Sequence, residues 1–145
     1  AYWLIPPGPG CDLVIAYQGA LAPEALEAHA RLLDDHPGAG LLAVTSADLL
    51  HRDWTASGRA RWQTQASSRS HIAQLFAPLA RHAGIVTLIA GSPSTLSWLG
   101  GVHGHRVRAL GVETFGQTGD LPDLYRAMRL DADAILDAAA DLALD

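Results

Sequence analysis

Short, largely apolar runs alternate along the chain with segments in which apolar residues recur every three or four positions. Three runs predict strands that are buried on both faces: residues 11–17, 41–45 and 85–90. Residues 107–112 predict a fourth strand. A fifth apolar run, residues 1–5, precedes a cluster of Pro and Gly and predicts a short edge strand. Because only that turn separates it from the next run, we expect antiparallel pairing at an edge, or a strand lying apart from the sheet.

The segments between and after these runs predict helices, from apolar spacing and from the residues at their ends. Ser46, Ser70, Ser92 and Asp131 suit the N-cap position, where a side-chain oxygen accepts a backbone N–H. The predicted helices run from Pro23 to before Pro37, over residues 48–52, over 71–82 with a kink near Pro78, from Pro93 to before Gly100, over 121–128 and over 132–144.

Residues 53–70 follow no clear period and are mostly polar. We interpret them as an irregular surface excursion with at most a turn of helix over residues 59–62. A long connection without secondary structure is usually functional or interfacial.

Strands that alternate with helices predict a parallel sheet covered on both faces, with right-handed crossovers. The expected fold class is α/β, with three α/β/α layers. A length of 145 residues, 49% of them hydrophobic, suits one domain spanning residues 1–145.

Composition excludes several classes of site. Cys11 is the only cysteine, so an internal disulfide and a four-thiolate zinc site are impossible. All ten basic side chains are Arg, which excludes a Schiff-base lysine and a phosphate-loop lysine. A net charge of −5 argues against a nucleic-acid partner. No apolar run approaches the roughly 18 residues of a membrane span, and the short apolar start without basic residues leads us to expect no signal peptide.

The carboxyl ends of the predicted strands, where doubly wound sheets hold ligands, match no dinucleotide or phosphate-loop pattern. Gly91-Ser92-Pro93-Ser94 would suit an anion at a helix N-terminus, but a tight turn with a cap is the favoured interpretation. No Gly-x-Ser-x-Gly elbow occurs, which disfavours an α/β-hydrolase.

Histidine and cysteine give no complete catalytic or metal site. His103 and His105 lie in one short loop, but two imidazoles without a nearby carboxylate are an incomplete zinc set, so we expect structural or solvated roles. Cys11 opens a buried strand and should behave as a small apolar residue. We therefore expect no catalytic, cofactor-binding or metal-ligating residue in this chain. The other histidines are expected at the surface: His29, His36, His51, His71 and His82.

Two tryptophans lie among arginines in the excursion. Arg52, Trp54, Arg61 and Trp62 are the candidate interface residues, because exposed aromatics and Arg are enriched where proteins meet. Base stacking on RNA would be another use, but the acidic net charge favours protein contact. Packing of one or both tryptophans into the core is the competing interpretation.

Two stretches of the chain carry further motifs. The first comprises Val44-Thr45-Ser46, residues 49–53, Arg61-Trp62 and Ile72-Ala73-Gln74; the second comprises residues 110–119 with Phe115-Gly116, then Leu124 and Leu130-Asp131-Ala132. Both stretches resemble the C-terminal domain of the thiamine-diphosphate enzymes of the transketolase superfamily, and the resemblance covers nearly the whole chain. The first stretch resembles the homodimeric type of pyruvate dehydrogenase decarboxylating component, and the opening Tyr2-Trp3 also looks like that type. The second stretch is general to the superfamily, and its Gln117-Thr118-Gly119 is closer to transketolases.

The resemblance implies a five-stranded, mostly parallel sheet with one antiparallel edge strand. It also implies a fragment of a longer chain, which agrees with a first residue that is not Met. In the intact enzyme, two preceding domains would hold thiamine diphosphate and Mg²⁺, and this domain would contribute to a homodimer interface and supply no cofactor ligand.

The resemblance further implies that the intact, cytoplasmic enzyme decarboxylates pyruvate and passes the acetyl unit to lipoyl groups of an acyltransferase core, a 2-oxo acid dehydrogenase complex. The isolated domain would be inactive. Two alternatives remain: the C-terminal domain of a transketolase-like ketol transferase, and a free-standing α/β binding module, which would be a self-sufficient monomer with a start codon just before Ala1.

Overall fold

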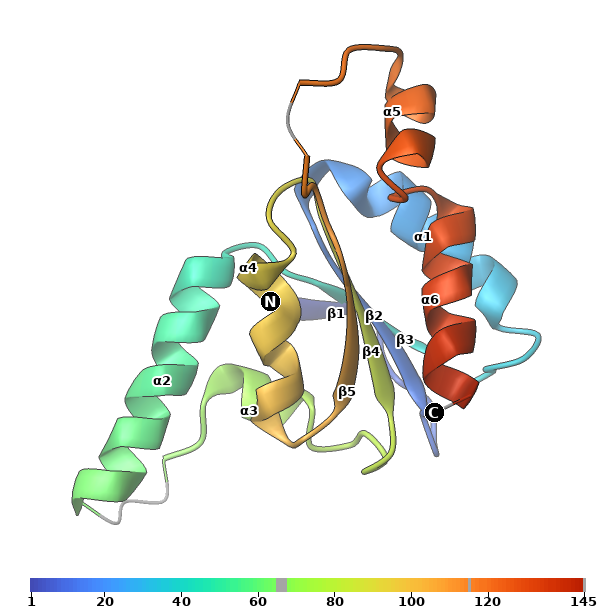
Figure 1. Cartoon of the computed structure of the whole chain (residues 1–145). Coiled ribbons are helices and arrows are strands. Elements are labelled where there is room, and N and C mark those ends of the chain that lie inside the picture. The colour runs from blue at the N-terminus through green and yellow to red at the C-terminus, as the bar shows by residue number, and fades with distance from the viewer. Residues whose placement is uncertain (65–67, 115, 145) are drawn as a thin grey trace.

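The computed structural model describes residues 1–64, 68–114 and 116–144, and its centre is a five-stranded sheet (Figure 1). The strands lie in the order β1-β3-β2-β4-β5. Their bounds are Tyr2–Ile5 for β1, Leu13–Gln18 for β2, Gly40–Ala43 for β3, Gly84–Ile89 for β4 and Arg106–Leu110 for β5.

One strand runs against the other four. β1 pairs antiparallel with β3, whereas β2 with β3, β2 with β4 and β4 with β5 are all parallel pairs. The expected edge strand is thus confirmed, and it pairs with the sheet instead of lying apart. The turn at Pro6-Pro7 lets the chain leave the edge strand and re-enter the sheet two strands away, at β2.

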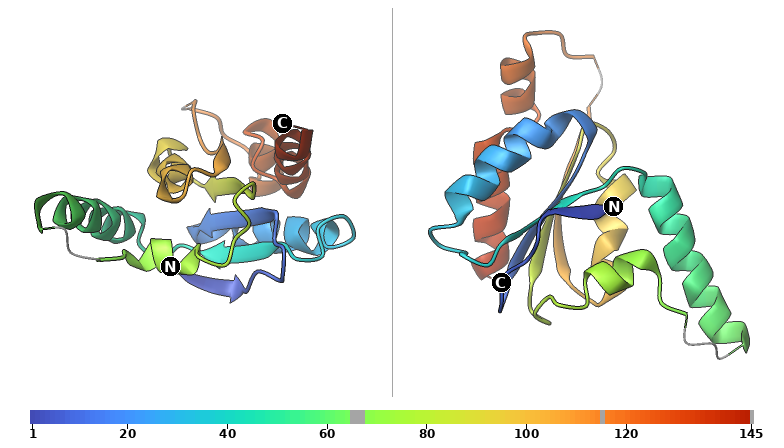
Figure 2. Two further views of the ribbon diagram at one scale, coloured as in Figure 1. Left: turned by 90° about the horizontal axis from the view of Figure 1, so that it is seen from below. Right: turned by 180° about the vertical axis from the view of Figure 1, so that it is seen from behind.

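Helices cover both faces of the sheet, which confirms the three-layer α/β architecture (Figure 2, left). Among the described helices, none is long and apolar enough to cross a bilayer. The α-helices are α1 (Ala22–Leu32), α2 (Ala47–Thr64), α3 (His71–Leu75), α4 (Ser94–Ser97), α5 (Leu121–Ala127) and α6 (Ala132–Leu144), with 3₁₀ turns at Gly19–Leu21 and Trp98–Val102.

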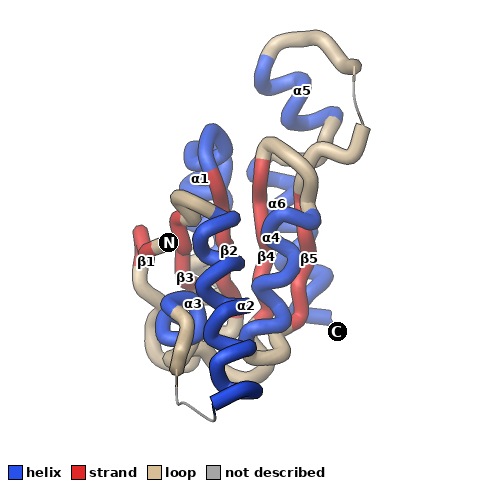
Figure 3. The backbone as a smooth tube through the Cα atoms, turned by 90° about the vertical axis from the view of Figure 1, so that its left-hand side faces the viewer, coloured by secondary structure: helices blue, strands red, loops and turns tan. Residues whose placement is uncertain are grey.

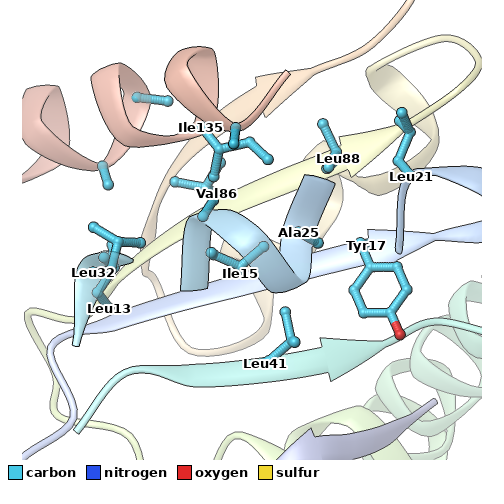
Figure 4. Packing of buried hydrophobic residues seen from close by; sticks show 14 of the residues in the cluster. Leu13, Ile15, Tyr17, Leu21, Ala25, Leu32, Leu41, Val86, Leu88 and Ile135 are labelled. Carbon is cyan, nitrogen blue, oxygen red and sulfur yellow. The ribbon is translucent and has the colours of Figure 1, made fainter. Parts of the chain in front are cut away.

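Two hydrophobic clusters fill the spaces between the layers. Alternate residues of β2 point to opposite faces, so Ile15 packs beneath α1 and α6 whereas Val14 packs beneath α2, α3 and α4. Figure 4 shows the first cluster, in which Val86 and Ile135 meet over the sheet. Figure 3 shows α2 and α3 in front of the sheet on the other face. Burial on both faces explains why these strands read as continuous apolar runs.

The predicted excursion over residues 53–70 is wrong for residues 53–58 and 63–64, because α2 continues through Thr64. The turn of helix expected over residues 59–62 is confirmed as part of α2. Buried or half-buried side chains on α2 recur at Ala47, Leu50, Trp54 and Ser57, which is the spacing of one helix face. Ser57 and Gly58 interrupt the apolar pattern and hide the period in the sequence. Part of the predicted excursion, residues 65–67, lies outside the described residues.

The helix predicted over residues 71–82 is also wrong in length, because α3 ends at Leu75. Pro78 disfavours helical backbone at the residue before it and offers no N–H, so two turns follow α3 instead of a kinked helix. The helix starts are better predicted. Ser70 Oγ accepts the Ala73 N–H at 3.3 Å, and an Asp131 carboxylate oxygen accepts the Ala134 N–H at 3.1 Å.

Candidate interaction surface

The segments that follow β4 and β5 lie against each other at the carboxyl ends of these two strands. The Val112 N–H donates to Gly91 O at 2.7 Å, and a Cβ on Gly111 would lie only 2.5 Å from that oxygen and 2.7 Å from Pro93 N. The segment after β5 therefore packs directly against the segment after β4.

The structure corrects one detail of this turn. Ser92 does not cap a backbone N–H, because its hydroxyl bonds to the Ser94 hydroxyl at 2.8 Å. The helix that follows, α4, has only four residues. A tight turn is confirmed here, and one short helical turn is too small to give an anion site.

Both loop histidines bond to backbone carbonyls. His103 Nε2 donates to Ala73 O at 3.0 Å, and His105 Nδ1 donates to Ala83 O at 3.1 Å. Burial lowers the pKa of His105, and the nearby His103 adds to this, while the bond to Ala83 opposes it. The two side chains thus fasten the loop before β5 to α3 and to the segment before β4.

His29 overturns the expectation that the remaining histidines lie at the surface. It is 2% exposed, and its Nε2 donates to Ala39 O at 2.9 Å. This bond joins α1 to the turn that leads into β3 and satisfies a carbonyl that is itself buried. His36 is half-buried, with Nδ1 3.0 Å from an Asp12 carboxylate oxygen, whereas His51, His71 and His82 are exposed.

Cys11 is a buried thiol. Burial raises the pKa of this thiol, although hydrogen bonds with backbone groups oppose the shift. The Sγ–H donates to Leu13 O at 3.1 Å. A protonated, enclosed thiol is a poor nucleophile, as expected for a small core residue.

Trp54 is half-buried in an aromatic cluster on the face of α2 that meets α4. Its ring stacks on Trp98 with centroids 5.1 Å apart, and His51 packs edge-on against Trp98 at 4.8 Å. Sequence reasoning missed both partners of Trp54. His51 lies one turn before it on α2, at 5.8 Å, which helical spacing could have shown, whereas Trp98 reaches the pair only because α4 and the turn after it lie beside α2.

Trp62 lies two turns further along α2 and is 93% exposed. Figure 1 and the right-hand view of Figure 2 show this end of α2 projecting away from the sheet. Trp54, Arg61 and Trp62 line one groove of about 570 Å³, and Gly58 and Gly101 also line it. The structure thus brings together three of the four candidate interface residues. Arg52 is exposed but does not line this groove.

The groove residues share one chemical character. Its walls are two indole rings and the arginine side chains of Arg59 and Arg61, and none of its lining residues is acidic. Indole rings and guanidinium groups bind well to apolar and acidic protein surfaces. We call this groove, lined by Trp54, Thr55, Gly58, Arg59, Arg61, Trp62, Gly101 and Val102, the α2 groove.

The chain does not fit the magnesium diphosphate that the resemblance implies for the intact enzyme. Across residues 1–64, 68–114 and 116–144, no three side chains of His, Cys, Asp or Glu converge where they could hold a metal ion. Several of the carboxylates are instead paired with arginines, as Asp133 is with Arg31 at 2.8 Å.

No protein-family model matches the chain, and no curated protein sequence matches it. Solved structures do match. A transketolase from Leishmania mexicana superposes with a TM-score of 0.68 over 98% of this chain, at 16% identity. A Pichia stipitis transketolase in complex with sedoheptulose-7-phosphate gives a TM-score of 0.64 over 99% of the chain, at 17% identity. The chain has a transketolase-like fold.

The match takes in only part of each neighbour. This chain corresponds to 18% of the length of the Leishmania and Pichia enzymes. It corresponds to 42% of a split-gene transketolase described as an inactive β4 tetramer, with a TM-score of 0.61 and 17% identity.

The structure also places the residues on which the sequence resemblance rests. Arg61-Trp62 lies at the projecting end of α2. Residues 116–119 lie in the connection between β5 and α5, and Phe115 lies outside the described residues.

Proposed function

We propose that this chain is the C-terminal assembly domain of a thiamine-diphosphate enzyme of the transketolase superfamily, whose reaction takes place on other domains. The observation that carries the proposal is the likeness to transketolases over 98% of the chain. The proposal gives the domain a role in homodimer stability and no cofactor ligand.

The α2 groove is the proposed assembly surface. An indole that is 93% exposed costs free energy in water, and its burial in an interface stabilises the complex by about 2–4 kcal/mol. Trp62 stands beside Arg61 in the groove, and this pairing of an aromatic anchor with arginine is typical of the residues that dominate binding. Arg52 joins this surface only if the partner also reaches the adjacent face of α2.

The split-gene neighbour supports the proposal that the isolated domain has no activity. That protein is described as an inactive β4 tetramer, so part of a transketolase can assemble without being active. In the parent of the present chain, thiamine diphosphate and Mg²⁺ would bind to the other domains.

Two parent reactions are proposed. The residues from Val44 to Gln74 resemble the pyruvate dehydrogenase decarboxylating component, which in a cytoplasmic 2-oxo acid dehydrogenase complex would pass an acetyl unit to lipoyl groups of an acyltransferase core. Ketol transfer is the second candidate, because the solved neighbours are transketolases and Gln117-Thr118-Gly119 resembles that branch.

Assays of the intact parent protein separate the two. Pyruvate-dependent reduction of lipoyl groups supports the first reaction, and transfer of a two-carbon ketol unit between sugar phosphates supports the second. Activity in neither assay, or an open reading frame that consists of this domain alone, would instead favour the free-standing binding module.

A further inference from the structure

The charges of the chain are segregated along the sequence. Residues 54–112 contain six Arg and no Asp or Glu, whereas all fifteen acidic residues lie outside this stretch. The stretch is therefore strongly basic, although the chain as a whole has a net charge of −5. A local excess of positive charge on an acidic protein favours an anionic partner at that place.

Three of these arginines surround a hollow of about 740 Å³ at the amino ends of β4 and β5. Arg61 comes from the end of α2, Arg69 precedes α3, and Arg81 precedes β4. His103 and His105 of the loop before β5 complete the polar wall. None of the lining residues is acidic. The rest of the lining is apolar and consists of Ala73, Phe76, Ala77 and Leu79.

Among the described residues, no ion pair involves Arg61, Arg69 or Arg81. The ion pairs within residues 1–64, 68–114 and 116–144 use other arginines, such as Arg31 with Asp133 and Arg129 with Asp137. Positive groups that converge on one hollow repel one another, and an anion placed between them removes that repulsion.

We propose that this hollow binds a small molecule that carries a phosphate group. A guanidinium is a rigid fork of donors that matches phosphate oxygens in pairs. A phosphate monoester has a charge of about −2 and three acceptor oxygens, so it bonds to several arginines at once, whereas a single carboxylate is satisfied by one.

The size and the walls of the hollow say more about this ligand. Its volume of about 740 Å³ falls in the range of small-molecule sites, about 300–1,000 Å³, and exceeds what inorganic phosphate fills. The apolar side of the wall, where Phe76 and Leu79 lie, would face the uncharged part of the molecule. The site lies at the opposite end of the sheet from the carboxyl ends of β4 and β5.

The test is an NMR titration of the isotope-labelled 145-residue chain with pyrophosphate as the phosphate probe. Inorganic phosphate and citrate form two further arms. We expect saturable shifts of the amides near Arg69, Ala73 and His103, with pyrophosphate half-saturating at about 0.1–1 mM. Citrate should bind at least several-fold more weakly.

Substitutions locate the site. Arg69→Gln and Arg81→Gln should each weaken pyrophosphate binding about tenfold, the loss expected for one charge-assisted hydrogen bond. Both side chains are exposed, so the variants should fold, which their amide spectra would verify. Arg106→Gln is the matched control, because it removes one charge from the same basic stretch outside the hollow, and it should change the affinity less than twofold.

Three results would overturn the proposal. The first is no saturable shift with pyrophosphate below about 10 mM. The second is an equal loss of affinity in Arg106→Gln, which would mean attraction to overall charge without a site. The third is citrate binding more tightly than pyrophosphate, which would assign the hollow to carboxylates.

Discussion

Trp54 and Trp62 lie on one helix, yet their surroundings differ completely. Trp54 stacks on Trp98, whereas Trp62 is almost fully exposed. Sequence reasoning grouped the two as interface candidates, because composition cannot distinguish a ring that packs on a neighbouring helix from one that faces solvent. The position of α4 decides between them, and that position depends on contacts distant in sequence.

Replacement of the two tryptophans should therefore have opposite signatures. We expect Trp54→Ala to lower the free energy of unfolding of this chain by about 1–3 kcal/mol, through lost packing against Trp98. Trp62→Ala should change it by less than about 0.5 kcal/mol and should instead weaken association of the parent enzyme. Chemical denaturation of the chain and sedimentation of the parent measure the two effects.

Leu121→Ala is the control for the sedimentation experiment, since Leu121 is also a large exposed apolar residue but lies on α5, away from the α2 groove. If Trp62→Ala leaves assembly of the parent unchanged, the α2 groove is not the assembly surface.

His105 gives the fold a dependence on pH. Burial lowers its pKa in the folded state below the ordinary value near 6.5. Below about pH 6.5 the unfolded chain therefore binds a proton that the folded chain does not, so the stability supplied by neutral His105 is lost as pH falls toward the lowered pKa.

Replacement of His105 by Asn should reduce this acid sensitivity. Asn supplies a side-chain N–H near the position of Nδ1 to donate to Ala83 O, but it does not titrate. We expect the loss of unfolding free energy between pH 7.5 and 5.5 to be smaller in His105→Asn than in the original chain, measured by urea denaturation. The exposed His82→Asn is the control, and an equal reduction there would contradict the assignment.

At the scale of single elements, α2 is the largest difference between sequence and structure. The stripe Ala47, Leu50, Trp54 and Ser57 has helical spacing, but only its first half is plainly apolar. In the sequence, Ser57 and Gly58 are typical of a loop, because both have low helix propensity. Tertiary contacts, more than local preference, stabilise that part of the helix. The buried strands were easier to predict, since a short apolar run enclosed on both faces needs no periodicity.

Gly58 and Gly100 allow a matched test of this packing. A Cβ on Gly58 meets nothing within 4 Å, so Gly58→Ala should stabilise α2 by about 0.5–1 kcal/mol through helix propensity. A Cβ on Gly100 would lie 2.6 Å from Val107 Cγ2 and 2.7 Å from His105 O, so Gly100→Ala should destabilise the chain by about 1–3 kcal/mol. Thermal unfolding of both variants measures the two effects, and equal destabilisation by Gly58→Ala and Gly100→Ala would contradict the open surroundings of Gly58.

For the molecule as a whole, the sequence predicted the number of strands, the burial of β2, β3 and β4, and the antiparallel edge. It did not predict the strand order, the length of α2 or the burial of His29. All three features depend on which surfaces of the folded chain meet. His29, for example, is buried because it bonds to the backbone oxygen of Ala39, and no sequence pattern identifies that oxygen as its acceptor. The basic hollow was also missed, because the net charge of −5 describes the whole chain and hides the separation of arginines from acidic residues along it.

The proposal that the cofactor binds to other domains of the parent enzyme predicts how the isolated chain behaves. Calorimetry of the 145-residue chain with thiamine diphosphate and Mg²⁺ should give no heat of binding at micromolar concentrations, because no described side chains gather to hold a metal ion. The intact parent should bind both. Micromolar binding by this chain alone would mean that the domain itself holds the cofactor.

The projecting end of α2 has a consequence for backbone protection. After Ser57, no described position of the helix is buried, and a stretch of one or two turns is only marginally helical in water. The amide hydrogens of these last turns should therefore exchange with deuterium much faster than those near Leu50. Near Leu50 the helical hydrogen bonds break only when the packing of α2 against the rest of the domain is also lost. Contact with a partner would slow that exchange, so the exchange rate of the amides in the last turns of α2 would measure association.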